Sequence, residues 1–476
     1  MTRSLFAAGC VAVFTMALGV VPASAQTLYE VLALTYETNP SLRAERAQLR
    51  ATDEAGAQAR AGRRPTLNGQ VTYETADGDF DPGDKLDLGG LLPEDGPPPD
   101  ELFGNLPGNG GAGTTQAGLE LTQPLWRGGQ VRNGVRSADA RINAAQAQLV
   151  AAEQALFYDT IDAYLGVRVA EETVSLTETS RQLLGRQREQ AQALFDAGSA
   201  TRTDIAQAAA RAAEAEAELI RARSELASAR TRFERITGRM PGTLEERPPL
   251  PGLPDTMDAA LMLALDANPQ MVIARAQEEA ASFALKQARG RLSPTLEAKA
   301  TYGYAENQFI DGDRSENMTL GAQITVPLFQ GGTTWSGIRE ARETHSAARY
   351  RTYDTEREVR SQVETVWQQV VAARAAWEAT EPAVEAASLA YEGLTLEGRL
   401  GQRSTLEVLD GEENLYRVQL TRLRALQAYY LASYRLLQVT GQLTAAGLGL
   451  PVDYYDPEEN RRDVAHRWIG TGPGYE

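Results

Sequence analysis

Histidine and cysteine, which often serve as catalytic bases, nucleophiles or metal ligands, are rare in this sequence of 476 residues. It contains two histidines, His345 and His466, and one cysteine, Cys10. No recognisable pattern of a nucleophile or of metal ligands surrounds either histidine, so we interpret both as surface side chains rather than as catalytic bases. The sequence therefore predicts no catalytic residue, no metal site and no cofactor, and we do not expect an enzyme.

An acidic segment at residues 77–84, DGDFDPGD, comes nearest to a metal-binding pattern. Asp77, Asp79 and Asp81 have the spacing that opens a calcium-binding loop. However, proline stands at the sixth position, where such a loop needs glycine, and Leu88 stands where a bidentate glutamate belongs. We interpret the segment as a flexible acidic loop, with calcium binding as the alternative.

Glycine pairs before two predicted helices could hold a phosphate on free backbone N–H groups. Both pairs follow the pattern Pro-Leu-aromatic, which favours a hinge between a strand and a helix over a phosphate site. The predicted hinge residues are Pro124, Gly128, Gly129, Pro327, Gly331 and Gly332.

Charge and the N-terminal residues indicate an exported protein. Lys and Arg number 47 against 64 Asp and Glu, a net charge of −17 that argues against a nucleic-acid partner. Residues 1–25 have the pattern of a signal peptide, because Arg3 precedes a long apolar run and ASA stands before Gln26. Its removal takes away Cys10 and leaves no thiol. No other run of about 18 apolar residues exists, so we expect any membrane crossing to use β-strands.

The sequence repeats itself, and the repeat defines its organisation. NPSLRAERAQ at 39–48 returns as NPQMVIARAQ at 268–277, and QPLWRGG at 123–129 returns as VPLFQGG at 326–332. The spacing falls from 229 to 203 residues because the first copy carries an insertion rich in Gly, Pro and Asp within 76–116. The predicted units are a first repeat at 26–238, a linker at 239–256, a second repeat at 257–441 and a tail at 442–476.

Each copy is predicted to run helix, strand, loop, strand, very long helix, turn and returning helix. Pro382 falls inside the second long helix, and because proline removes a backbone hydrogen bond we expect that helix to bend or break near Glu381. The expected elements are hairpins at 65–124 and 294–328, long helices at 130–196 and 333–397, turns at 196–203 and 398–404, and returning helices at 203–237 and 404–440.

The predicted strands alternate between apolar and polar residues. In the first, Leu67, Val71 and Tyr73 alternate with threonine, asparagine and glutamine over about ten residues, the length of a tilted transmembrane strand. A soluble hairpin packed on a core is the alternative. The signal peptide, the repetition and aromatic residues near both ends of the hairpins favour the membrane strand. These aromatic residues are Trp126, Phe329 and Trp335 at one end and Tyr302, Tyr304 and Phe309 at the other.

Several motifs resemble the TolC family of outer-membrane efflux and secretion channels. They are the tandem NP, the hairpins that end in PLxxGG, and the long helices that follow. LGQRSTLEVLD at 400–410 resembles the periplasmic tip motif of that family, and ATRTDIAQA at 200–208 resembles its counterpart in the first repeat. The tail at 450–470 is similar to the C-terminal segment of the TolC branch proper. The resemblance covers the whole mature chain.

The resemblance implies a mainly α fold with a small β part. Long antiparallel coiled-coil helices would form a trimeric α-barrel, and four transmembrane strands per subunit would complete a twelve-stranded β-barrel in the outer membrane. The implied function is a passive exit duct of a tripartite efflux or type I secretion system. Its partners would be two further copies of the chain, a periplasmic adaptor protein, an ABC or proton-driven pump of the inner membrane, and outer-membrane lipid. A coiled-coil scaffold of the cell envelope that forms no channel is the alternative function.

The resemblance also implies a gate at the periplasmic tip. By position, Asp204 corresponds to the acid of the first repeat, Arg403 to the gate arginine, and Glu407 and Asp410 to rings of acidic residues. The tip turns contain Gly198 and Gly401. Gly398 stands where the family has its gate tyrosine, so the sequence departs from the pattern there. The alternative for Arg403 and Glu407, four residues apart, is an ordinary surface ion pair.

Overall fold

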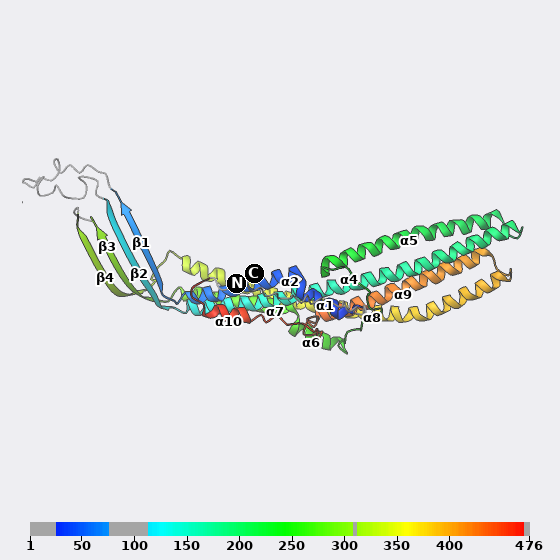
Figure 1. Ribbon diagram of the computed structural model, residues 1–476. Coiled ribbons are helices and arrows are strands. Elements are labelled where there is room, and N and C mark those ends of the chain that lie inside the picture. The colour runs from blue at the N-terminus through cyan, green and yellow to red at the C-terminus, as the bar shows by residue number, and fades with distance from the viewer. Residues whose placement is uncertain (1–24, 76–112, 308–311, 471–476) are drawn as a thin grey trace, which may run out of the picture.

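The computed structural model describes residues 25–75, 113–307 and 312–470. Figure 1 shows a long molecule with a β-sheet at one end and helices along the rest of its length. The predicted signal peptide up to residue 24, the acidic segment at 77–84, Phe309 and most of the inserted loop lie outside the described residues.

The same series of elements occurs twice along the chain. The first copy comprises α1 (Leu28–Thr38), α2 (Pro40–Ala61), β1 (Thr66–Glu74), β2 (Thr114–Arg127), α4 (Gln130–Asp196) and α5 (Arg202–Thr237). The second comprises α6 (Met257–Ala267), α7 (Pro269–Gly290), β3 (Thr295–Glu306), β4 (Arg314–Thr325), α8 (Thr333–Arg399) and α9 (Thr405–Val439), and α10 (Glu459–His466) follows in the tail. The mainly α fold with a small β part is the predicted fold.

The two long helices, α4 and α8, have 67 residues each and extend roughly 100 Å at 1.5 Å per residue. Their predicted spans are confirmed to within two residues. In the half of the molecule away from the sheet, α4 packs along α5 and α8 packs along α9. In the other half, α4 packs along α2 and α7, and α8 packs along α7. We call the first two units the α4–α5 pair and the α8–α9 pair.

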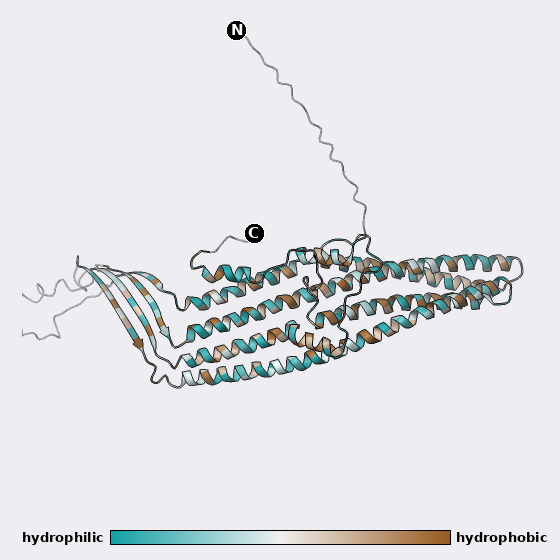
Figure 2. Cartoon of the chain, turned by 90° about the horizontal axis from the view of Figure 1, so that it is seen from below, coloured by the Kyte–Doolittle hydropathy of each residue, from teal (hydrophilic) through white to brown (hydrophobic). Residues whose placement is uncertain are grey.

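Pro382 does not interrupt α8, so of the predicted bend or break near Glu381 the break is absent. The helix is continuous from Thr333 to Arg399, although Figure 2 shows it curving along its length. Pro382 and Glu378, whose carbonyl loses its helical N–H partner, both lie on the exposed face of α8. Water can therefore hydrate the freed carbonyl, and packing against α9 keeps the surrounding turns helical.

The two NP motifs join short helices to the ends of returning helices. Asn39 accepts a hydrogen bond from the N–H of Ser41 at 2.9 Å and so caps α2, where Pro40 occupies the first turn. Its side-chain amide donates to the carbonyl of Ile236, near the end of α5, at 2.9 Å. Asn268 repeats both contacts in the second copy, with its amide donating to the carbonyl of Val439 at 2.8 Å. Each motif thus satisfies backbone groups of two helix ends at once.

The four strands form one antiparallel sheet in the order β1-β2-β3-β4. Its register brings the apolar residues of all four strands to one face, as when Leu67 pairs with Leu121 and Ala300 pairs with Leu320. The helices of the described chain leave this face uncovered, and Val71 and Leu320 are 77% and 78% exposed. The alternation predicted from sequence is confirmed, and the sheet is not packed on a core. No helix among the described residues is both long and apolar enough to span a membrane.

The main core lies midway along the molecule, where the linker crosses the helices. Three tyrosines of the long and returning helices bond to the linker backbone. Tyr430 donates to the carbonyl of Pro248 at 2.7 Å and Tyr434 donates to that of Pro249 at 3.1 Å. Tyr164 accepts from the N–H of Glu245 at 3.0 Å, and burial raises its pKa to about 12, so it stays protonated. These bonds fix the linker around the middle of the helices.

Candidate gate and hinge

The two tip turns at the end of the molecule away from the sheet have the same backbone geometry. Gly198 and Gly401 adopt left-handed conformations with φ of 75° and 73°. In each turn a backbone N–H returns to a carbonyl five residues earlier, Ser199 to Leu194 at 2.8 Å and Gln402 to Glu397 at 2.9 Å. This is the glycine-dependent C-terminal cap of a helix, and it lets the chain reverse within a few residues.

The acids that follow these turns cap the returning helices. Asp204 accepts hydrogen bonds from the N–H and the hydroxyl of Thr201, both at 2.8 Å, and these bonds hold its pKa below the ordinary value. Glu407 makes the equivalent bonds to Ser404, both at 2.9 Å. The backbone bond from Ser404, followed by the bond from Arg403, lowers the pKa of Glu407 to about 2. Both carboxylates are therefore ionised at neutral pH and already bonded within their own turns.

Arg403 bonds to two acids of its own helical hairpin. Its Nε donates to Glu397 Oε2 at 2.7 Å and its Nη1 donates to Glu407 Oε1 at 2.8 Å. Asp204 is bonded to Thr201 instead, so the structure of the single chain does not bring Arg403 and Asp204 together. The surface ion pair of Arg403 and Glu407, which we gave as the alternative to a gate contact, is present.

A different arginine joins the two helix pairs near the tip. Arg211 on α5 lies 2.8 Å from Glu413 and 3.4 Å from Asp410, both on α9. It also lies 3.3 Å from Glu214 on its own helix. The predicted acid Asp410 is thus bonded across the two pairs rather than free. Sequence reasoning missed Arg211, because the partners are about 200 positions apart and no local pattern connects them.

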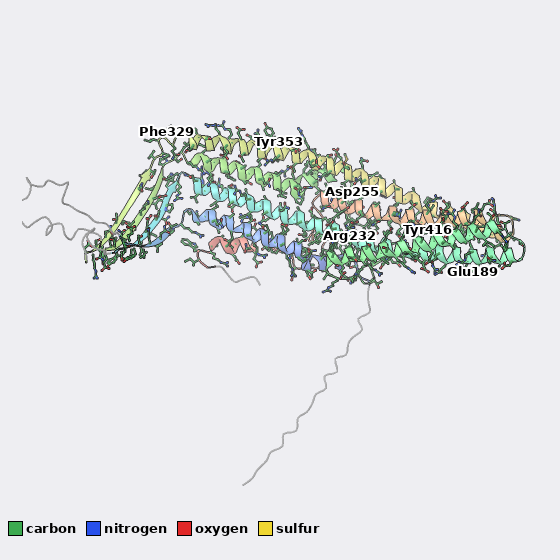
Figure 3. All side chains as sticks on the ribbon, turned by 90° about the horizontal axis from the view of Figure 1, so that it is seen from above. Glu189, Arg232, Asp255, Phe329, Tyr353 and Tyr416 are labelled. Atoms are coloured by element: carbon green, nitrogen blue, oxygen red, sulfur yellow. The ribbon has the colours of Figure 1, made fainter. Side chains whose placement is uncertain are left out.

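Partly buried polar contacts between α4 and α9 lie close to this ion pair. The hydroxyl of Ser180 donates to Glu412 at 2.6 Å, and the hydroxyls of Thr177 and Tyr416 lie 3.0 Å apart. Figure 3 places Tyr416 in the half of the molecule that ends at the tip. Glu412 is 5% exposed, and burial raises its pKa above the ordinary value. Leu184, Ala215 and Leu409 form a small apolar cluster that unites α4, α5 and α9.

Gly398, where the resemblance led us to expect a tyrosine, lies against α9. A Cβ atom at this position would stand 2.8 Å from Val408 Cγ2, closer than carbon atoms can approach without a shift. Because Gly398 has no side chain, α8 and α9 can pack closely against each other next to the tip turn.

The glycine pairs between strands and helices all have positive φ. The values are 56° and 76° at Gly128 and Gly129, and 59° and 85° at Gly331 and Gly332. A Cβ on Gly128 would also stand 2.5 Å from the carbonyl oxygen of Gly290. Pro124 lies where the pairing of β2 with β3 shifts by a bulge, one of the few places in a sheet that accept proline. Pro327 falls between the end of β4 and the start of α8.

Most of the chain matches a known protein family. The sequence profile of the outer membrane efflux protein family matches residues 31–239 and 260–442, well over half of the chain. The chain belongs to this family. The two matched segments begin inside α1 and α6 and end just after α5 and α9.

Relatives and a solved structure resemble the chain over most of its length. Outer membrane efflux protein BepC of Brucella suis biovar 1 is 30% identical over 449 residues, which cover 94% of this chain and 92% of BepC. Alkaline protease secretion protein AprF of Pseudomonas aeruginosa is 29% identical over 364 residues, 73% of this chain and 74% of AprF. The crystal structure of CusC matches with a TM-score of 0.73 at 15% identity, over 88% of this chain and 92% of CusC.

This outer membrane efflux protein therefore resides in the outer membrane, and its helices extend into the periplasm. The location accounts for the uncovered apolar face of the sheet, because lipid can cover it. Trp126, Phe329 and Trp335 are exposed where the sheet meets the helices, and Figure 3 shows Phe329 at this junction. Aromatic side chains of this kind gather at the surface of a membrane.

Proposed function

We propose that three copies of this chain form one channel, a passive exit duct from the periplasm to the outside of the cell. The observation that carries the proposal is the four-stranded sheet, whose apolar face is exposed and whose strands β1 and β4 have no outer partner among the described residues. Open strand edges are not stable in lipid, and four strands are too few to close on themselves. Three sheets joined edge to edge would make a closed barrel of twelve strands.

The helices then continue this duct into the periplasm. The α4–α5 pair and the α8–α9 pair of three subunits would stand side by side as the wall of an α-barrel. We propose a periplasmic adaptor protein and an inner-membrane pump, either an ABC transporter or a proton-driven one, as the partners that recruit the duct. The name of BepC favours efflux and the name of AprF favours protein secretion, so the proposal covers both kinds of cargo.

The tip turns form the proposed gate. Asp204, Arg403, Glu407 and Asp410 would lie at the constriction, with the acids making it attractive to cations. Arg211 adds a feature to this gate, because its bonds to Asp410 and Glu413 hold the two helix pairs of one subunit together. We propose that the tip opens when the two pairs separate, and that Gly128, Gly129, Gly331 and Gly332 are the hinge at the opposite end of the helices.

Purified protein tests the channel against the alternative, a coiled-coil scaffold of the envelope. The full-length chain should be recovered from outer-membrane fractions as a heat-resistant trimer. In planar lipid bilayers this trimer should produce discrete steps of ion current. A monomer, or a trimer that inserts but never conducts, would favour the scaffold.

A further inference from the structure

A cleft of about 430 Å³ lies where β2 ends and α4 begins. The segment just after the end of α2 forms another wall of the cleft. The residues that line the cleft are of two kinds: apolar residues, both aromatic and aliphatic, and arginines. The lining residues used below are Arg63, Trp126, Arg127, Arg132 and Arg136.

The positive charge of this cleft is only partly neutralised. Arg127 forms an ion pair with Glu297 at 2.9 Å, and Arg136 lies over the ring of Phe283. Arg63 and Arg132 are exposed, and neither has an ion pair with another residue in the described parts of the chain. Two guanidinium groups are thus available to a ligand, and their planar forks match the oxygens of a phosphate.

The second copy of the repeat lacks this charge at the same place. Leu292 occupies the position of Arg63, Gln330 that of Arg127, and Trp335 that of Arg132. Only Arg136 has a basic counterpart, Arg339. Because both junctions have a glycine pair with positive φ before the long helix, the basic residues are not needed to build such a junction. At the positions of Arg63, Arg127 and Arg132, the basic residue is a property of the first copy alone.

The cleft adjoins the lipid-facing side of the sheet. Trp126 pairs with Leu296 in the register of β2 and β3, and paired residues share a face, so Trp126 belongs to the apolar face. Trp126 and the neighbouring Leu125 are more than half exposed. A lipid whose chains lie on the apolar face would therefore have its headgroup at the level of the cleft, on the periplasmic side of the membrane.

We propose that this cleft binds the phosphate of an anionic glycerophospholipid in the periplasmic leaflet of the outer membrane. Arg63 and Arg132 donate to the phosphate oxygens, and the acyl chains lie along the apolar face beside Trp126. Free phosphate has the same oxygens, but a lipid adds the apolar contact that this site offers. The proposal depends on the membrane location and not on conduction, so it stands apart from the exit duct.

The test uses the full-length trimer in a neutral detergent. Phosphatidylglycerol and phosphatidylcholine are titrated separately, and bound lipid is counted by native mass spectrometry. The variant Arg63→Ala with Arg132→Ala is compared with a matched control, Arg291→Ala with Arg339→Ala, which removes the same charge at the junction of the second copy. A further arm adds glycerol 3-phosphate as a soluble competitor, and unheated gels report the trimer.

The expected result is about one tightly bound phosphatidylglycerol per subunit and weaker binding of phosphatidylcholine. The Arg63 and Arg132 variant should weaken phosphatidylglycerol binding roughly tenfold, as the loss of bonds to a charged group implies, while the control stays near the parent. Soluble glycerol 3-phosphate should not displace the lipid. The proposal is overturned by unchanged phosphatidylglycerol binding in the variant, by an equal loss of binding in the control, or by displacement of the lipid with glycerol 3-phosphate. It is also overturned if the variant loses its trimer while its lipid binding is unchanged.

Discussion

Arg211 of α5 and Glu413 of α9 bond at 2.8 Å between the two helix pairs of one subunit. Their side chains are 34% and 50% exposed, so water and salt reach the contact. Exposed ion pairs are individually weak, and this one is assisted by Asp410 and by the buried contacts of α4 with α9. The arrangement suits the proposed gate, in which this contact would hold the tip closed and still release it.

Replacing Arg211 should loosen the tip. Arg211→Ala removes the bonds from α5 to α9, so the backbone amides of 409–416 should exchange with deuterium faster than in the parent. Arg221→Ala is the matched control, because Arg221 bonds only to Glu218 on its own helix in the described chain. Equal protection of 409–416 in parent and Arg211→Ala would show that the ion pair does not hold the helix pairs together.

Burial of Glu412 predicts a pH dependence of stability. Its pKa is raised above the ordinary value of 4.5, chiefly by burial, so in the native protein it binds a proton more tightly than in the unfolded chain. The free energy of unfolding should therefore decrease as the pH rises from 4.5 through the raised pKa. Glu412→Gln keeps an oxygen for Ser180 and should remove this part of the pH dependence.

The measurement is the thermal unfolding temperature of the trimer between pH 4.5 and 7.5. Glu189→Gln is the control, since Glu189 is exposed on α4 near the tip. The prediction fails if the Glu412→Gln variant loses as much stability with rising pH as the parent does.

Two equivalent glycines should differ in their tolerance of a methyl group. Gly128 and Gly331 both have positive φ, which costs a residue with a side chain about 1–2 kcal/mol. Only at Gly128 would the new Cβ meet other atoms, at 2.4 Å from Ser293 Cβ, whereas Gly331 has open space. Gly128→Ala should therefore lower the unfolding temperature of the trimer more than Gly331→Ala. Equal effects, or a reversed order, would show that the close approach of β2 to the end of α7 is not important.

A charge on the apolar face of the sheet should prevent membrane insertion. Leu320 lies on that face and its neighbour Thr319 lies on the other. An arginine facing lipid costs about 2–4 kcal/mol at the middle of the bilayer, so Leu320→Arg should reduce the trimer in outer-membrane fractions. Thr319→Arg should insert normally, because its side chain points away from lipid. If the two variants insert equally well, the apolar face does not contact lipid.

Local features of the fold could be predicted from sequence, and the gate contacts could not. The capping acids Asp204 and Glu407 lie three residues after Thr201 and Ser404, so a short pattern contains each interaction completely. The strand faces and the spans of α4 and α8 follow in the same way from periodicity and repetition. The bonds of Arg211 depend on how two long helices are rotated and aligned, which no local pattern determines.

Pro382 shows a second limit of prediction from sequence, because the local effect of the residue is clear but its outcome depends on the rest of the fold. Proline removes a backbone hydrogen bond wherever it stands inside a helix, but whether the helix breaks depends on the exposure of Glu378 and on the packing of α8 against α9. Both are properties of the folded chain. A proline on a buried face of the same helix would have left an unsatisfied carbonyl and favoured the predicted break.

Single-channel conductance in planar bilayers tests the gated duct most directly. The parent trimer should insert and conduct weakly, because the tip contacts hold it closed. Arg211→Ala and Arg403→Ser should each give larger conductance steps, and combining them should increase the steps further, while Arg221→Ala behaves as the parent does. Trimers that insert without conducting, or variants whose steps equal those of the parent, would contradict a channel gated at its helical tip.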